Sequence, residues 1–163
     1  TPVDLLRRAG FDVTTAALAN EIQVTGKNHI TVLADTGFDS VRARSFDWLI
    51  LPGGPGTARM KEDLRLRALI REQNDAGRGI AAICAAPLAL KEAGILPGRP
   101  FTGHHTIAEE LPELDASRSV LVDRNLITSR GAGTAHPFAF AIIERALGRD
   151  ARDAVAESIH WRE

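Results

Sequence analysis

The strongest constraint on this chain comes from two short, largely apolar runs, at residues 47–51 and 79–83. Strands in which nearly every side chain is apolar are buried on both faces, and they occur in parallel sheets that helices cover on both sides. Helical patterns follow the two runs, at residues 57–76 and 85–93. The sequence therefore predicts an α/β domain built on a mostly parallel sheet.

The rest of the chain continues this alternation. We expect further helices at 2–9, 106–111, 134–147 and 150–159, and further strands at 11–17, 30–34, 100–102, 119–122 and 125–128. Asp123 and Arg124 predict a tight turn between the last two strands, and Asp63 is expected to break the helix at 57–76. Because the chain opens with a helix, we expect the first strand of the sheet to be absent.

The composition narrows the class of protein. The 163 residues fit a single domain over 1–163, and 44% hydrophobic with 25% charged residues is typical of a folded globular chain. The net charge is −1 without a long block of either sign, so we expect no nucleic-acid partner. No stretch approaches the roughly 18 apolar residues of a membrane span, and no export leader opens the chain. We expect a cytoplasmic protein with no membrane partner.

Cys84 is the single cysteine, which excludes an internal disulfide and any multi-cysteine zinc site. It stands where the 79–83 strand passes into a predicted helix, an order similar to a nucleophile elbow. A helix beginning at Ala85 would direct its positive end at the sulfur and favour the thiolate. The alternative is an inert thiol buried in the core.

A glycine-rich loop, Pro-Gly-Gly-Pro-Gly at residues 52–56, follows the other apolar strand. Gly53 and Gly54 let the backbone approach a neighbour closely. An amide of this loop and the amide of Ala85 would form a two-donor oxyanion site beside Cys84. The alternative is a tight turn without a binding role. The loop is not a phosphate-binding P-loop, because no Gly-Lys-Ser/Thr follows at the required spacing.

Two further segments belong to the same predicted edge of the sheet. His104 and His105 follow the extended piece at 100–102, and a histidine beside a cysteine can move its proton. A metal site built from Cys84 and these histidines is disfavoured, because neighbours on an extended strand point in opposite directions. The glycine-containing segment 128–134 could hold an anion, but its spacing does not match a dinucleotide fingerprint. We therefore expect no metal and no cofactor.

Three segments carry a resemblance to a known family. Leu-Pro-Gly-Gly at 51–54, Ala-Ala-Ile-Cys-Ala-Ala-Pro at 81–87 and Thr-Ser-Arg-Gly-Ala-Gly-Thr at 128–134 resemble the ThiJ/PfpI superfamily, in particular the branch of the Parkinsonism-associated deglycase and its bacterial relatives. The similarity extends from residue 2 to the last helix. It implies a flavodoxin-like sandwich and a homodimer. Family members begin with a strand and a glutamate that touches the reactive cysteine, and this chain starts after that point.

The resemblance also implies roles for individual residues. Cys84 matches the reactive cysteine, and His104 matches a histidine near it in some members. Asp4 matches an acidic residue that in some relatives reaches the histidine of the partner subunit. The remaining matched positions are the amides of Gly54 and Ala85, which face the cysteine's oxyanion, and a pocket-lining pair, Ser129 and Arg130.

The family implies several functions. Its members act as glutathione-independent glyoxalases that consume methylglyoxal, as deglycases of early glycation adducts, as chaperones and as oxidation sensors. We expect a cysteine-dependent enzyme acting on small reactive aldehydes or their adducts. The alternatives are a non-catalytic sensor or chaperone that works by oxidation of Cys84, and a folded but inactive remnant. A PfpI-like peptidase is disfavoured, because Ala85 stands where that branch has a histidine.

Overall fold

The computed structural model describes residues 1–19 and 21–162, and a four-stranded sheet forms its centre. Its strands are β5 (Trp48–Leu51), β6 (Gly79–Ile83), β7 (Val120–Asp123) and β8 (Leu126–Ser129), in the order β5-β6-β8-β7. Strands β5, β6 and β8 are parallel, and β7 pairs antiparallel with β8 as a hairpin. The expected mostly parallel sheet is confirmed.

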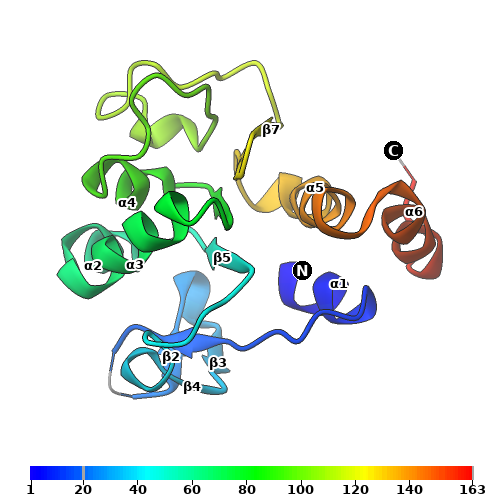
Figure 1. Ribbon diagram of the computed structural model, residues 1–163, viewed down its shortest axis with the longest axis horizontal. Helices are drawn as coiled ribbons and strands as arrows, with labels where there is room; N and C mark the ends of the chain where they lie inside the picture. Colours follow the sequence, from blue (N-terminus) through cyan, green and yellow to red (C-terminus); the bar gives the residue numbers. More distant parts are fainter. Residues whose placement is uncertain (20, 163) are drawn as a thin grey trace.

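Helices cover both faces of this sheet (Figure 1). They are α1 (Pro2–Arg8), α2 (Thr57–Glu62), α3 (Leu64–Asp75), α4 (Pro87–Glu92), α5 (Ala135–Leu147) and α6 (Arg149–Ser158). Helices α2, α3 and α4 lie on one side, and α1, α5 and α6 lie on the other. The break between α2 and α3 falls at Asp63, whose carboxylate accepts hydrogen bonds from the amides of Arg65 and Leu66 and so begins a new helix.

The core is divided by the sheet into two layers. In β6, Ile80 and Ala82 pack with α3 and α4, whereas Ala81 and Ile83 pack with α1 and α5. All of β6 is buried, because it lies between two strands and two helical layers. Consequently, the end of β6 is held firmly at the middle of the sheet edge, where Cys84 follows it.

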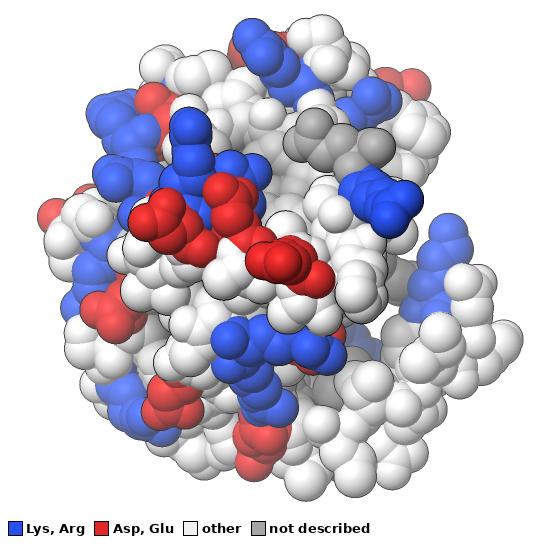
Figure 2. All heavy atoms as spheres, turned by 90° about the vertical axis from the view of Figure 1, so that its right-hand side faces the viewer, with Lys and Arg blue, Asp and Glu red and all other residues white. Residues whose placement is uncertain are grey.

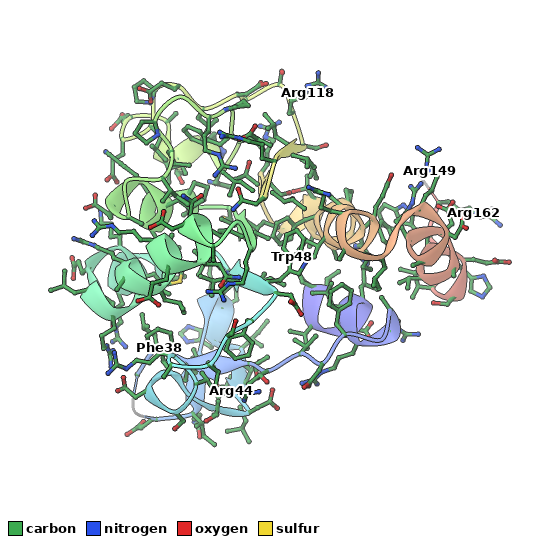
Figure 3. The ribbon with its side chains drawn as sticks, viewed as in Figure 1. Phe38, Arg44, Trp48, Arg118, Arg149 and Arg162 are labelled. Carbon is green, nitrogen blue, oxygen red and sulfur yellow. The ribbon has the colours of Figure 1, made fainter. Side chains whose placement is uncertain are left out.

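Trp48, labelled in Figure 3, packs into the layer of α1 and α5. Its indole lies over Gly79 on the neighbouring strand, where a Cβ would come within 2.3 Å of the ring. Gly79 therefore provides the space that the large side chain occupies at the start of β5 and β6.

Two small sheets lie outside the central one. β1 (Ala16–Ala17) pairs parallel with β4 (Thr36–Gly37), and β2 (Gln23–Thr25) pairs antiparallel with β3 (Thr31–Leu33). The strand expected at 30–34 is confirmed, but the expected strand at 11–17 is correct only for its last two residues. A strand needs a hydrogen-bonded neighbour, and β4 offers one only along Ala16–Ala17.

Three other expectations need correction. Residues 100–102 are not a strand, since the amide of Thr102 binds the hydroxyl of Thr128 instead of a backbone carbonyl. The helix expected at 106–111 is a single 3-10 turn, η3 (His105–Ile107). The helix expected at 85–93 begins at Pro87, because the chain first turns sharply after Cys84.

The surface over α6 carries both signs of charge. Figure 2 shows acidic and basic side chains interspersed on that face. Ion pairs account for part of this mixture, including Arg152 with Asp153 at 2.8 Å and Arg149 with Glu144 at 3.7 Å. None of the helices in the described part of the chain is long and apolar enough to cross a membrane.

Candidate active site around Cys84

Cys84 follows β6 in a strained turn, with a φ of 66° that side-chain-bearing residues seldom adopt. Its amide donates a hydrogen bond to the carbonyl of Ser129 at 2.9 Å, and its carbonyl accepts one from the amide of His104 at 2.8 Å. Both backbone groups are therefore fixed from neighbouring segments. The turn has the sharp geometry after a strand that the sequence predicted. The side chain of Cys84 is half-buried.

Gly53 lies directly against Cys84. A Cβ at this glycine would stand 2.4 Å from the Cβ of Cys84 and 3.0 Å from its Sγ. Only glycine permits this approach, so the Pro-Gly-Gly loop has a specific packing role beside the thiol. The adjacent Gly54 has a φ of +91°, which turns the loop toward α2.

The two amides expected to bind an oxyanion are those of Gly54 and Ala85. Within residues 1–19 and 21–162, neither of them donates a hydrogen bond to another protein group. Both are consequently available to an anion. The helix that the sequence predicts from Ala85 begins two residues later, and α4 is only six residues long. The positive end of α4 therefore does not begin directly after Cys84, contrary to what the sequence predicted.

His104 is fixed beside this turn by η3. Its Nδ1 accepts a hydrogen bond from the amide of Thr106 at 3.4 Å and lies 2.9 Å from the Thr106 hydroxyl, so a neutral ring carries its proton on Nε2. Partial burial lowers the pKa of His104 below its usual 6.5, and the positive charges of His105, Lys27 and Arg130 lower it further. The ring is therefore neutral at pH 7 and able to accept a proton.

His105 differs from the expectation that it would point away from His104. The two ring centroids lie 4.2 Å apart, because His104 is extended and His105 begins the 3-10 turn. Even so, among the described residues no three His, Cys, Asp or Glu side chains are grouped closely enough to hold a metal ion.

The segment after β8 forms another wall of the site. Ser129 is fully buried, and its hydroxyl binds the Ser119 carbonyl at 3.0 Å and the Thr134 hydroxyl at 2.6 Å. Its side chain therefore holds the loop in shape. Arg130 is half-buried, and a Cβ at Gly131 would lie 3.4 Å from Cδ2 of His104. Three separate segments thus bring the backbone around Arg130 next to Cys84 and His104.

Asp4 lies apart from this group. Its exposed carboxylate pairs with Arg8 at 3.0 Å, four residues along α1. It lines an open groove of about 460 Å³ together with His136 and Trp161, whose rings stack 4.7 Å apart. The sequence pattern gave no reason to single out His136, because its partner Trp161 is distant in the chain. The predicted contact of Asp4 with a partner subunit stays a prediction.

Known proteins resemble this chain along almost its whole length. The model of the DJ-1/PfpI family matches residues 1–145. Protein dj-1beta of Drosophila melanogaster is 38% identical over 160 residues, which cover 96% of this chain and 86% of the fly protein. The crystal structure of that fly protein superimposes with a TM-score of 0.95 at 36% identity, covering 99% of this chain and 89% of the other. The expected flavodoxin-like fold is confirmed by this match.

Two further relatives are known by an activity or by a chemical state. A protein of Caenorhabditis elegans named glutathione-independent glyoxalase DJR-1.2 is 32% identical over 161 residues, covering 96% of this chain and 84% of the nematode protein. The structure of oxidized Toxoplasma gondii DJ-1 superimposes with a TM-score of 0.94 at 26% identity, covering 99% of this chain and 90% of the other.

Proposed function

The chain belongs to the DJ-1/PfpI family, and from this premise we propose that it is a cysteine-dependent enzyme acting on small reactive aldehydes, such as methylglyoxal, or on their early glycation adducts. The observation that carries the proposal is the strained turn at Cys84, fixed by hydrogen bonds at both backbone groups. Strain held in this way is typical of active sites. The name of the nematode relative, a glutathione-independent glyoxalase, supports the same chemistry.

The first step is addition of the Cys84 thiolate to the aldehyde carbon. A carbon–sulfur bond forms, and the carbonyl electron pair moves to oxygen, which gives a hemithioacetal after protonation. The free amides of Gly54 and Ala85 are available to stabilise the developing oxyanion. Gly53 supports this step by allowing the loop to lie against the sulfur.

The second step is a proton transfer between adjacent carbons. Neutral His104 takes the proton from the hemithioacetal carbon and returns a proton to the neighbouring carbon, the former ketone, which becomes an alcohol. The product is a thioester, and water then releases the hydroxy acid and regenerates the thiol. One carbon is oxidised while its neighbour is reduced, so the reaction needs water but no external oxidant or reductant.

The direct test is formation of lactate from methylglyoxal in a buffer without amines. We expect lactate from the unaltered protein and none from Cys84→Ser, with circular dichroism showing that the variant is folded. Ser158→Ala, at the end of α6, is a matched control that should retain activity. Equal lactate from protein and Cys84→Ser, or none from a folded unaltered protein, would contradict the proposal.

A second candidate is an oxidative sensor or chaperone that works through Cys84. Two free amides beside the single thiol would also hold a sulfinate, the anion formed when a thiolate gains two oxygens. The oxidized state of the Toxoplasma relative is consistent with this candidate. Treatment with mild peroxide, followed by intact mass measurement, distinguishes them: two added oxygens without any aldehyde turnover favours the sensor.

We also propose a homodimer in the cytoplasm. Val24 and Val32 face each other across the β2–β3 hairpin, and Ile22 and Ile30 share their side of it, yet all four are exposed. An uncharged apolar face of this kind is suited to a second copy of the chain. Light scattering at micromolar concentration should give twice the mass of the chain, and only monomer mass would contradict the dimer. The single cysteine supports the cytoplasmic location.

A further inference from the structure

Arg130 is a cation that the proposed mechanism does not use. It follows Ser129, whose carbonyl binds the Cys84 amide, and it precedes Gly131, which lies against His104. Its own amide donates to the Ser119 carbonyl at 3.2 Å, which fixes the backbone. Arg130 is half-buried as a residue, and its guanidinium forms no ion pair with a carboxylate in residues 1–19 and 21–162.

Most other partly buried arginines in the described part of the chain are paired with a carboxylate. Arg99 pairs with Asp123 at 2.7 Å, and Arg65 pairs with Asp63 at 2.6 Å. A charge that is partly removed from water without a counter-ion is costly, so such groups are normally paired. Arg78 also lacks a carboxylate partner, but its guanidinium donates hydrogen bonds to the side-chain oxygens of Gln73 and Ser45. Among the described residues, the guanidinium of Arg130 makes neither kind of contact, which leaves it open to an anion from outside the chain.

Lys27 adds a second positive charge from a different part of the fold. It begins the 3-10 turn η1 (Lys27–His29) at the tip of the β2–β3 hairpin, and its charge acts on His104 together with that of Arg130. Lys27 also has no carboxylate partner within the described part of the chain. In the described part of the chain, the charges that lower the pKa of His104 are all positive, so the surroundings of this histidine, whose amide binds the Cys84 carbonyl, favour an anion.

We propose that the Cys84 site prefers aldehydes that carry a second, anionic group, a carboxylate or a phosphate, and that Arg130 determines this specificity by binding that group. The inference rests on the proposed function for its aldehyde chemistry. A guanidinium presents paired N–H donors that match the oxygens of either anion. Partial burial strengthens this attraction relative to a fully hydrated surface charge.

The first experiment measures anion attraction without requiring catalysis. Iodoacetate and iodoacetamide both alkylate Cys84, as the thiolate displaces iodide, but only iodoacetate is anionic. Because the chain has one cysteine, intact mass gives each rate directly. We expect the iodoacetate-to-iodoacetamide rate ratio, normalised to free cysteine, to exceed one, and to fall about tenfold in Arg130→Gln. Lys27→Gln should lower it less, and the exposed control Arg149→Gln should leave it unchanged.

The second experiment compares a neutral aldehyde with anionic ones. Hydroxypyruvaldehyde and its phosphate ester form a matched pair, and dioxovalerate provides the carboxylate arm. We expect the unaltered protein to have a kcat/KM about tenfold higher for the phosphate ester than for the neutral aldehyde, and Arg130→Gln to abolish this ratio mainly through KM. A higher kcat/KM for dioxovalerate than for the phosphate ester would identify the carboxylate as the preferred anion.

The outcomes separate this inference from the proposed function. Turnover of neutral and anionic aldehydes at equal kcat/KM, with an alkylation ratio that Arg130→Gln does not change, overturns the inference and leaves the enzyme intact. An alkylation ratio that Arg130→Gln lowers, without turnover of any aldehyde, supports the anion site and removes the proposed enzyme. An alkylation ratio no greater than that of free cysteine rejects the anion site whatever the turnover.

Discussion

Gly53 and Cys84 belong to different strand ends, yet their backbones meet so closely that a Cβ on Gly53 would stand 2.4 Å from the Cβ of Cys84. Real Cβ atoms do not approach other heavy atoms to this distance, so any side chain at position 53 must displace the loop or the thiol. The contact joins the loop after β5 to the turn after β6. It thereby fixes where the amide of Gly54 lies relative to the sulfur.

Gly53→Ala tests this contact. We expect the added methyl group to lower the rate of lactate formation at least tenfold and to reduce the free energy of unfolding by about 2 kcal/mol, because a close-packed site must shift to admit it. The control is Gly56→Ala, where a Cβ would meet no atom within 4 Å and the backbone is already helical. Activity and urea denaturation measure both effects. Unchanged lactate formation in Gly53→Ala would show that the contact does not matter for catalysis.

Much of the fold follows from sequence patterns because its central strands are so apolar. The apolar run at Gly79–Ile83 indicated a buried strand, and Asp63 marked the start of α3. The β2–β3 hairpin was not predicted in full, since Gln23–Thr25 is short, partly polar and exposed on both faces. Its pairing depends on β3 and cannot be read from β2 alone.

The candidate site was predictable in part for the same reason. Parallel strands bring their carboxyl ends to one edge, so Cys84, Gly53 and His104 were expected near one another. The charge environment was not predictable, because Lys27, whose positive charge lowers the pKa of His104, belongs to a hairpin far away in the sequence. Likewise, the positive φ of Cys84 depends on hydrogen bonds from two distant segments.

The strain at Cys84 predicts an unusual order of stabilities. A glycine tolerates a φ of 66°, whereas alanine retains the clash of its Cβ with the following carbonyl. We expect Cys84→Gly to be more stable than Cys84→Ala by about 1 kcal/mol. In the extended strand β6, Ala81→Gly should have the opposite effect and destabilise the protein. Chemical denaturation of the three variants is the measurement, and equal stability at position 84 would show that the turn carries no strain.

His104 should have a lower pKa than an ordinary histidine. Partial burial and the neighbouring cations lower its pKa, so the imidazole should become protonated only below the usual value of 6.5 and stay neutral above it. Lys27→Gln removes one positive charge and should move the pKa of His104 upward. The control, Lys61→Gln, removes a charge that pairs with Glu110 and should leave it unchanged. Nuclear magnetic resonance follows the ring directly, with the signal assigned from His104→Gln. A pKa at or above 6.5 in the unaltered protein would contradict the charge environment described here.

The buried Arg99 guanidinium leads to a prediction about stability rather than catalysis. It binds the carboxylate of Asp123 at 2.7 Å and the side-chain oxygens of Asn125 and Asn74 at 3.0 and 3.1 Å. It therefore joins the turn between β7 and β8 to the end of α3. Arg99→Met should lower the free energy of unfolding by about 2 kcal/mol, because several charge-assisted hydrogen bonds are lost from a nearly buried site.

Arg124→Met is the matched control, since Arg124 reaches the same carboxylate at 3.3 Å from an exposed position and should change stability by less than about 0.5 kcal/mol.

Burial raises the pKa of Asp123, but the hydrogen bond and charge of Arg99, together with Arg124, outweigh this and hold the pKa below 3.8. A lowered folded-state pKa means that the stabilisation is complete above the unfolded-state value and is lost as the pH falls through the folded-state value. Acid should therefore reduce the difference in stability between the unaltered protein and Arg99→Met. Urea denaturation at neutral and acidic pH measures this difference, and a difference that grows with acid would show that Asp123 does not stabilise the fold through Arg99.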